Sequence, residues 1–258
     1  MTSLRRVLIV AVMTAGSVGL LAAAPKAEGY LRPGDAPDAI RILPPPPPPG
    51  SPAAARDRAA FVATRAFQGT SRWTAAAHDD KIGPLDVLAD FNCATGVALD
   101  ELKTPILAQL FARVRIDSSA VVGPPKRFYA RPRPYVGTGA PICVAETEDL
   151  RGSPDYPSGH ATYGWAAALV LAEIDPAHAT AILERGREYG ESRVICGVHS
   201  PSAVDAGRTN GALLVATLHG NQAFRDDVDA ARRELAGLTR STTAACAVEA
   251  KVLAAAAY

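Results

Sequence analysis

Three short motifs, well separated along the chain, hold residues that could carry out chemistry together. They are Lys126-x6-Arg133-Pro134, Pro157-Ser158-Gly159-His160 and Ser192-Arg193-x5-His199. The set contains three cations and two histidines, with small residues between them. Such a set suits a site that grips a phosphate-like oxyanion while one imidazole attacks and the other moves a proton.

The three cations Lys126, Arg133 and Arg193 are predicted to form an anion clamp. An arginine grips phosphate oxygens with two parallel hydrogen bonds, whereas a lysine supplies a point charge. Arg133 lies between two prolines, which restrict the backbone and help to hold the guanidinium in place. Three positive charges would offset the charge that builds up on the equatorial oxygens during phosphoryl transfer.

The two histidines are expected at the starts of helices. Ser158 is a candidate N-cap, so the backbone amides from Gly159 onward would point at a bound anion, with His160 beside them. His199 lies just before Pro201, a residue type that often opens a helix. An imidazole in that place can attack phosphorus.

Other catalytic patterns are missing from the sequence. The run around Ser158 is not G-x-S-x-G, no G-x4-G-K-[ST] loop occurs, and the acidic residues lack metal-ligand spacing. We therefore expect no metal and no cofactor. The formal net charge of +1 creates no global field that would attract nucleic acid, so nucleic acid is not an expected partner.

The helices that must position these residues begin after Ser51, and the period-two alternation of strands is nearly absent. The expected helical segments are 53–67, 73–78, 85–91, 99–114, 158–174, a stretch after Pro176, a stretch from Pro201 to Leu218, and 224–238. Pro105 should kink the fourth segment or begin its second piece. Pro124 and Pro125 should end any continuation before Lys126. The sequence predicts an all-α fold.

Two other regions precede the helical part. Two arginines followed by an apolar run that ends near residue 24 are typical of a secretory signal peptide, assigned to 1–27 with the cleavage site left open. An uncleaved membrane anchor is the less favoured alternative for the same segment. Residues 28–50, with six consecutive prolines, are predicted to form an extended proline-rich arm, and 51–258 the helical domain. No later segment reaches about 18 apolar residues. We therefore expect a periplasmic or secreted protein with no membrane contact after signal cleavage.

Four cysteines follow the signal, at positions 93, 143, 196 and 246. An even number in an exported chain permits two disulfides, with three possible pairings. No C-x-x-C pair occurs, which argues against a zinc site.

Taken together, the three motifs resemble the signature of the superfamily that unites type 2 phosphatidic acid phosphatases, bacterial acid phosphatases and vanadium haloperoxidases. That signature reads Lys-x6-Arg-Pro, then Pro-Ser-Gly-His, then Ser-Arg-x5-His-x3-Asp. Further stretches are similar to the class A nonspecific acid phosphatases of the bacterial periplasm, namely 28–31, the proline run to Ser51, 156–160, 164–174 and 192–197. The resemblance implies a compact helical bundle with the site at one end, in a metal-independent enzyme that forms homo-oligomers.

The resemblance also implies a role for each residue. The phosphate-binding residues would be Lys126, Arg133, Ser158, Gly159 and Arg193. His199 would be the nucleophile that forms a phosphohistidine. His160 would protonate the leaving alkoxide and then activate water. The protein would be an acid phosphatase acting on small-molecule phosphomonoesters. Its acid pH optimum would follow because His160 must be protonated while His199 is not.

One position departs from the signature. The family aspartate lies four residues after the nucleophilic histidine and orients its imidazole, but this chain has Ala203 there. Asp205 lies six residues after His199, and six residues of helix turn through about 600°, a net rotation of about 240°, so it should face away. Loss of an orienting aspartate in a serine triad costs about 10⁴ in rate. We therefore expect reduced activity, or rescue by another group.

Two other functions remain open on the sequence. A catalytically weak phosphate- or vanadate-binding protein would keep the anion clamp without turnover, and Ala203 favours it. The presence of both His160 and His199 counts against it, because binding alone does not need two imidazoles. A vanadium-dependent haloperoxidase would share the clamp, but those chains are much longer.

Overall fold

The computed structural model describes residues 28–254, so the signal peptide assigned to 1–27 lies outside the described residues. The described part of the chain forms helices and no strand, which confirms the all-α prediction. Outside the central group of helices, the elements are α1 (Ala39–Ile42), α2 (Pro52–Thr64), η1 (Arg65–Phe67), α3 (Ser71–His78), α4 (Pro84–Ala89), α5 (Asn92–Thr95), α7 (Glu148–Gly152), η2 (Pro176–His178) and α12 (Ala244–Leu253).

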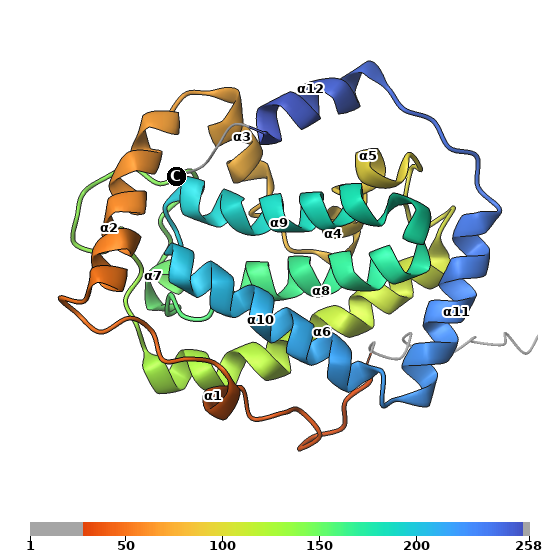
Figure 1. Ribbon diagram of the computed structural model, residues 1–258, viewed down its shortest axis with the longest axis horizontal. Helices are drawn as coiled ribbons and strands as arrows, with labels where there is room; N and C mark the ends of the chain where they lie inside the picture. Colours follow the sequence, from red (N-terminus) through yellow and green to blue (C-terminus); the bar gives the residue numbers. More distant parts are fainter. Residues whose placement is uncertain (1–27, 255–258) are drawn as a thin grey trace, which may run out of the picture.

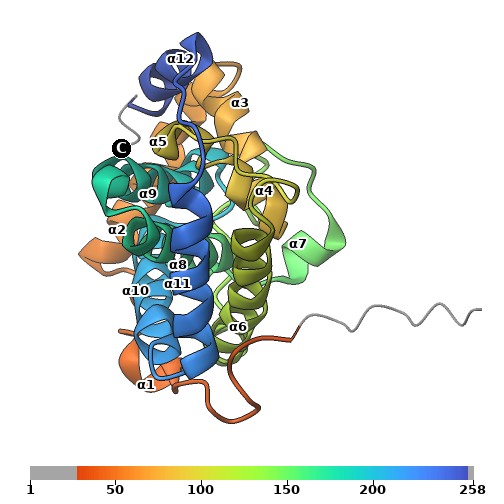
Figure 2. The same cartoon turned by 90° about the vertical axis from the view of Figure 1, so that its right-hand side faces the viewer.

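The central helix is α8 (Gly159–Ile174), and four long helices pack around it. They are α6 (Pro105–Tyr129), α9 (Ala179–Cys196), α10 (Pro201–Leu218) and α11 (Gln222–Ala236), and the two views show them on different sides of α8 (Figure 1 and Figure 2). Buried side chains occur all round α8. A helix that is apolar all round belongs in the interior.

Helix α10 approaches the start of α8 at backbone distance. A Cβ at Gly207 would lie 2.6 Å from the carbonyl oxygen of Ser158, and one at Gly211 would lie 2.5 Å from that of Thr162. Only glycine permits such an approach. The first turn of α10, which follows His199, is therefore held next to the N-terminus of α8.

Helix α6 contradicts one sequence prediction. It begins at Pro105, which agrees with the expectation that this proline could start a helix. It does not end at Pro124 and Pro125 but continues through them to Tyr129. A proline inside a helix leaves the carbonyl four residues earlier without its hydrogen bond. Here the Asn210 side chain donates to the carbonyl of Val121, at 3.2 Å, and so satisfies the group that Pro125 leaves free.

The segment 28–50 lies along the helical body and is extended apart from the short helix α1 (Figure 1). Its Tyr30 and Leu43 are buried. The backbone N–H of Tyr30 donates to a carboxylate oxygen of Asp117 on α6, at 2.8 Å. This contact ties the segment to the helix that also carries Lys126.

Two disulfides connect elements that are distant in the chain. Cys93 of α5 is bonded to Cys246 of α12, and Cys143 in the loop before α7 is bonded to Cys196 at the end of α9. The sequence had left three pairings open. The observed pairing connects α12 to α5 and the end of α9 to the loop before α7.

The sequence predicts no membrane contact for the chain that follows the signal peptide. Among the described residues, no single helix has the length and apolar character needed to cross a bilayer. Two consecutive helical segments, Gly159–Ile174 and Pro176–Cys196, are together long and apolar enough to cross a bilayer, but they meet at a bend of 119°.

Candidate active site

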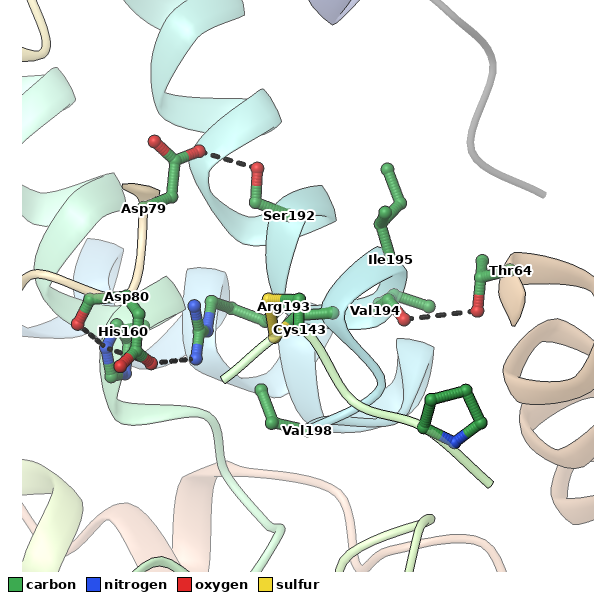
Figure 3. Close-up of a disulfide and its surroundings, with 12 residues drawn as sticks. Thr64, Asp79, Asp80, Cys143, His160, Ser192, Arg193, Val194, Ile195 and Val198 are labelled. Carbon is green, nitrogen blue, oxygen red and sulfur yellow. Dashed lines mark hydrogen bonds and ion pairs between the residues drawn. A yellow bond between two sulfur atoms is a disulfide. The ribbon is translucent and has the colours of Figure 1, made fainter. Parts of the chain in front are cut away.

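A cavity of about 260 Å³ lies where the C-terminal half of α6 meets the N-terminus of α8. It is lined by five of the seven predicted site residues, Lys126, Arg133, Gly159, His160 and His199. The other two, Ser158 and Arg193, are buried. Figure 3 shows the Arg193 side chain directed toward Asp80 and His160.

The turn after α9 positions His199. The helix ends at Cys196, and Gly197 takes a left-handed conformation with φ +83°, where a side chain would be strained. The backbone N–H of His199 then donates to the carbonyl of Arg193, at 3.2 Å. Two residues of the third motif are therefore locked to each other through the backbone.

Arg65 and the Cys143–Cys196 disulfide both hold this end of α9. Figure 3 shows the disulfide beside the end of the helix. The guanidinium of Arg65 donates to the carbonyls of Val194 at 3.4 Å and Ile195 at 2.6 Å. The last carbonyls of a helix have no intrahelical donors and carry partial negative charge, so a cation there is stabilising.

The hydrogen bonds of His199 determine its tautomer. Its Nε2 lies 3.1 Å from Nη1 of Arg133, which can only donate. The Nε2 atom therefore carries the lone pair, and the proton is on Nδ1, which donates to Oδ1 of Asp155 at 3.0 Å. Burial and the charges of Arg133 and Lys126 hold the pKa of His199 well below its usual range. The imidazole is neutral, with a nucleophilic nitrogen on the cavity side.

Asp155 is the contact that sequence reasoning missed. It lies in the loop before α8, 44 positions from His199, so no spacing pattern connects the two. Its Oδ1 also accepts the backbone N–H of Ser200 at 3.1 Å, and its Oδ2 accepts the Ser200 hydroxyl at 2.6 Å. Burial raises the pKa of the Asp155 carboxyl, whereas the Ser200 hydrogen bonds and the charge of Arg131 favour the ionised form.

Arg131 joins Asp155 to a wider polar network. Its Nε lies 3.6 Å from Asp155, and its Nη2 donates to Asp57 of α2 at 2.8 Å. Its Nη1 donates to the hydroxyls of Ser200 at 3.1 Å and Ser202 at 2.8 Å. The carboxylate beside His199 is thus held by partners on several elements.

Neither of the two positions on α10 that the sequence drew attention to supplies the carboxylate that contacts the imidazole: alanine has no hydrogen-bonding side chain, and Asp205 pairs with Arg208. Ala203 is fully buried, packs with Tyr156 and Ala206, and its carbonyl accepts the backbone N–H of Ser158 at 2.9 Å. Asp205 is exposed and pairs with Arg208 at 2.9 Å, facing away as helix geometry predicted.

The anion clamp is desolvated. Burial and the charge of Arg133 lower the pKa of Lys126 to about 7, and burial lowers the pKa of Arg133 to about 10. Lys126 donates to the carbonyl of Pro154, and Nε of Arg133 donates to that of Ser153 at 2.7 Å. The loop before α8 therefore orients both cations.

Arg193 has unused donors. Its Nη2 donates to Oδ1 of Asp80 at 2.5 Å, but its Nε and Nη1 are buried without a hydrogen-bond partner among the described residues. A buried guanidinium nitrogen without a partner is costly, and an oxyanion would satisfy it.

His160 stands beside the clamp. Its Nε2 donates to the backbone carbonyl of Asp80 at 2.9 Å, since a carbonyl can only accept, and its ring stacks on Tyr189. Burial and the charge of Arg193 hold the pKa of His160 well below its usual range. The imidazole therefore gains its second proton only in acid.

Ser158 caps α8, as predicted. Its hydroxyl oxygen accepts the backbone N–H of Ala161 at 3.3 Å, and Gly159 lines the cavity directly after it. The positive end of the α8 dipole and the first amides of the helix thus face the cavity.

A group of potential metal ligands exists outside the cavity lining. Ligand atoms of His78, Asp79 and Asp90 lie within 4.8 Å of one another. Arg185 donates to Asp79 at 2.6 Å and lies 3.5 Å from Asp90, so a guanidinium already supplies the positive charge there. Within the described residues that line the cavity there is no carboxylate and no cysteine.

Comparison with known proteins gives one family. The model of the PAP2 superfamily matches residues 106–226. An acid phosphatase of Zymomonas mobilis is 42% identical over 199 residues, which cover 77% of this chain and 75% of the relative. Non-specific acid phosphatases of Providencia stuartii and Salmonella typhimurium are 36% and 35% identical, over 82% and 75% of this chain and 86% and 78% of their own.

Proposed function

The chain belongs to the PAP2 superfamily and is an acid phosphatase of the class A non-specific type, and we propose that it hydrolyses phosphate monoesters through a phosphohistidine on His199. The observation that carries the proposal is the pair of hydrogen bonds at His199. Asp155 holds the Nδ1 proton at 3.0 Å, and the lone pair of Nε2 is left next to Arg133 at 3.1 Å, in the cavity.

The anion clamp would bind the phosphoryl group. Lys126 and Arg133 line the cavity, and Arg193 brings two unpaired buried donors. In a water-poor site such charges stabilise the developing charge of the transition state more strongly than they would in water. The amides at the start of α8 add donors of the same kind.

The reaction would then proceed in two steps. In the first, Nε2 of His199 attacks phosphorus, an N–P bond forms and the ester P–O bond breaks, and His160 protonates the leaving alkoxide. Because the carbonyl of Asp80 holds the Nε2 proton of His160, the proton that is transferred belongs to Nδ1. In the second, neutral His160 takes a proton from water, which attacks phosphorus and releases phosphate and His199.

Asp155 would take over the role of the family aspartate, which is replaced by Ala203 in this chain. It contacts Nδ1, the imidazole nitrogen that must be held if Nε2 is to attack, and it is buried and charge-supported by Arg131. We therefore favour rescue over the reduced activity expected from Ala203. The binding-protein alternative rested on Ala203 and loses that basis.

Export to an oxidising compartment is part of the proposal. Two disulfides in the described structure fit a secreted or periplasmic protein, because such bonds are rare in the cytosol. The signal peptide and the homo-oligomer stay predictions.

The test is hydrolysis of p-nitrophenyl phosphate from pH 4 to 8 with EDTA, combined with rapid denaturation at alkaline pH, where the P–N bond of a phosphohistidine survives, to trap a phosphorylated enzyme. We expect turnover and a trapped phosphohistidine in the native protein, and neither in His199→Ala. His219→Ala is the matched control, since His219 is a surface residue paired with Glu173. Turnover that survives in His199→Ala would refute the mechanism.

A further inference from the structure

The cavity extends well beyond the anion clamp along α6. The residues of α6 that line it include Arg115, Ser118, Ser119, Val122 and Lys126. This spacing of three and four residues marks one face of a helix. Arg115 and Lys126 are eleven residues apart, which separates their Cα atoms by about 16 Å along the axis. The cavity is therefore a groove, with the clamp at one end and a fourth cation, Arg115, at the other.

Arg115 and His160 are anchored to the same short loop. Nε of Arg115 donates to the carbonyl of Ile82 at 3.3 Å, and Nε2 of His160 donates to the carbonyl of Asp80 at 2.9 Å. Two residues of chain span at most about 7 Å. The guanidinium and the imidazole proposed to protonate the leaving group are thus held by neighbouring carbonyls of one loop and line the same groove.

The side chain of Arg115 is fixed but not neutralised. Its Nη1 donates to the hydroxyl of Ser119 at 2.6 Å, and its Cζ lies 5.6 Å from the centre of the Tyr163 ring. Among the residues that the structure describes, no carboxylate lies within ion-pair distance of it, and none lines the groove. The charge of Arg115 is also felt at His160, whose pKa is lowered by burial first, then by Arg193, and to a smaller extent by Arg115.

The volume of the groove leaves room for more than the phosphoryl group. Its roughly 260 Å³ is many times the space of about 30 Å³ that one water molecule takes in the liquid. The hydroxyls of Ser118 and Ser119 give the intervening wall polar character suited to an alcohol that carries other polar groups.

We propose that Arg115 forms a second anion subsite, which binds a negatively charged group carried by the alcohol of the substrate. This inference rests on the proposed function, because it takes the leaving group to lie on the His160 side of the clamp. The favoured substrates are then monoesters of an alcohol that bears a carboxylate or a second phosphate. Esters of uncharged alcohols are the poorer class.

The test uses two matched pairs of substrates. The first is 3-phosphoglycerate against glycerol 3-phosphate, which differ in a carboxylate, and the second is fructose 1,6-bisphosphate against fructose 6-phosphate, which differ in a phosphate. For each pair the measured quantity is the ratio of kcat/KM, charged over uncharged, at one pH. A merely structural role of Arg115 would change both members alike and leave the ratio unmoved.

We expect Arg115→Gln to lower at least one ratio about tenfold, the size of one lost charge-assisted contact. Arg115→Lys should keep part of the ratio, because it keeps the charge. Arg127→Gln is the matched control, since Arg127 lies on the same helix outside the groove lining, and it should leave both ratios unchanged. The pair that responds identifies the anionic group.

Two outcomes separate this inference from the proposed function. Ratios that stay the same in Arg115→Gln, with turnover intact, overturn the subsite and leave the phosphatase. If the native protein hydrolyses none of the four compounds, the proposed function fails, and the subsite is then judged by calorimetry on His199→Ala. Tighter binding of 3-phosphoglycerate that Arg115→Gln abolishes supports it, and equal binding of the pair overturns it.

Discussion

Replacing Asp155 by asparagine removes the carboxylate that contacts the imidazole of His199. The substitution keeps the shape of the side chain, so packing around the fully buried group is preserved. What is lost is the negative charge, together with the certainty that an acceptor faces Nδ1 of His199.

The magnitude follows from the hydrogen bonds that Asp155 makes. A bond to a charged group contributes about 1.5–3 kcal/mol, so loss of the charge alone slows the reaction by about 10- to 100-fold. If the amide turns its NH2 group toward His199, the tautomer is inverted, and the loss approaches the roughly 10⁴-fold cost seen in a serine triad. We expect kcat of Asp155→Asn to fall by at least about tenfold.

Introducing a carboxylate at position 203 should affect turnover differently in the native protein and in Asp155→Asn. In the native protein, Ala203→Asp puts a second carboxylate into a fully buried position, which costs about 1–3 kcal/mol of stability and gives no gain in turnover. In Asp155→Asn, the same change returns a carboxylate to the position that the family uses, so we expect it to recover activity.

The assay is a double-mutant cycle on kcat and kcat/KM with p-nitrophenyl phosphate, each variant being checked by urea unfolding. Asp205→Asn is the matched control, since Asp205 is an exposed carboxylate on α10, the helix that also carries Ala203. The kcat of this variant should stay within about twofold of native. A kcat for Asp155→Asn within about threefold of native would refute the assignment, because it is smaller than the loss of any charged hydrogen bond.

Three further predictions concern pH and stability. Burial lowers the pKa of Lys126 to about 7, so its charge is present below that pH and lost above it, and kcat/KM should fall there; in Lys126→Arg the limb should move to higher pH, and an unmoved limb would contradict the assignment. Cys143→Ser/Cys196→Ser should lower the unfolding free energy by about 2–4 kcal/mol and also lower kcat, because the bond holds the end of α9; urea unfolding and steady-state kinetics measure both, and a native kcat would show that other contacts suffice. Burial raises the pKa of Asp90 to about 7, so the stability that this carboxyl contributes should be lost as the pH rises from about 4 to 7; Asp90→Asn should unfold at higher urea than native at pH 8 but not at pH 4, and parallel pH curves would count against the shift.

Local signals in the sequence predicted much of the fold and part of the candidate site. Ser158 was predicted to be an N-cap and caps α8, and Pro201 opens α10. These signals depend on neighbouring residues, since a cap bonds an amide three residues away and a proline restricts its own backbone. The clamp residues and both histidines were proposed from residue type and spacing, and five of the seven predicted site residues line one cavity.

Where the sequence prediction was wrong, a distant residue was responsible. Pro124 and Pro125 were expected to end the helix before Lys126, but Asn210 satisfies a carbonyl that they free. No pattern near residue 124 contains that information. The disulfide pairing was likewise decided by which helices pack together.

The orientation of His199 was decided by tertiary structure alone. The sequence shows that the usual aspartate is replaced by Ala203, and it shows that Asp205 should face away. It does not show that Asp155, from the loop before α8, reaches the same imidazole nitrogen. The sequence by itself determined which groups are available for chemistry, because residue type and local conformation are properties of the chain. Which carboxylate meets which imidazole depends on packing between α8, α9 and α10, and only the folded structure decides that.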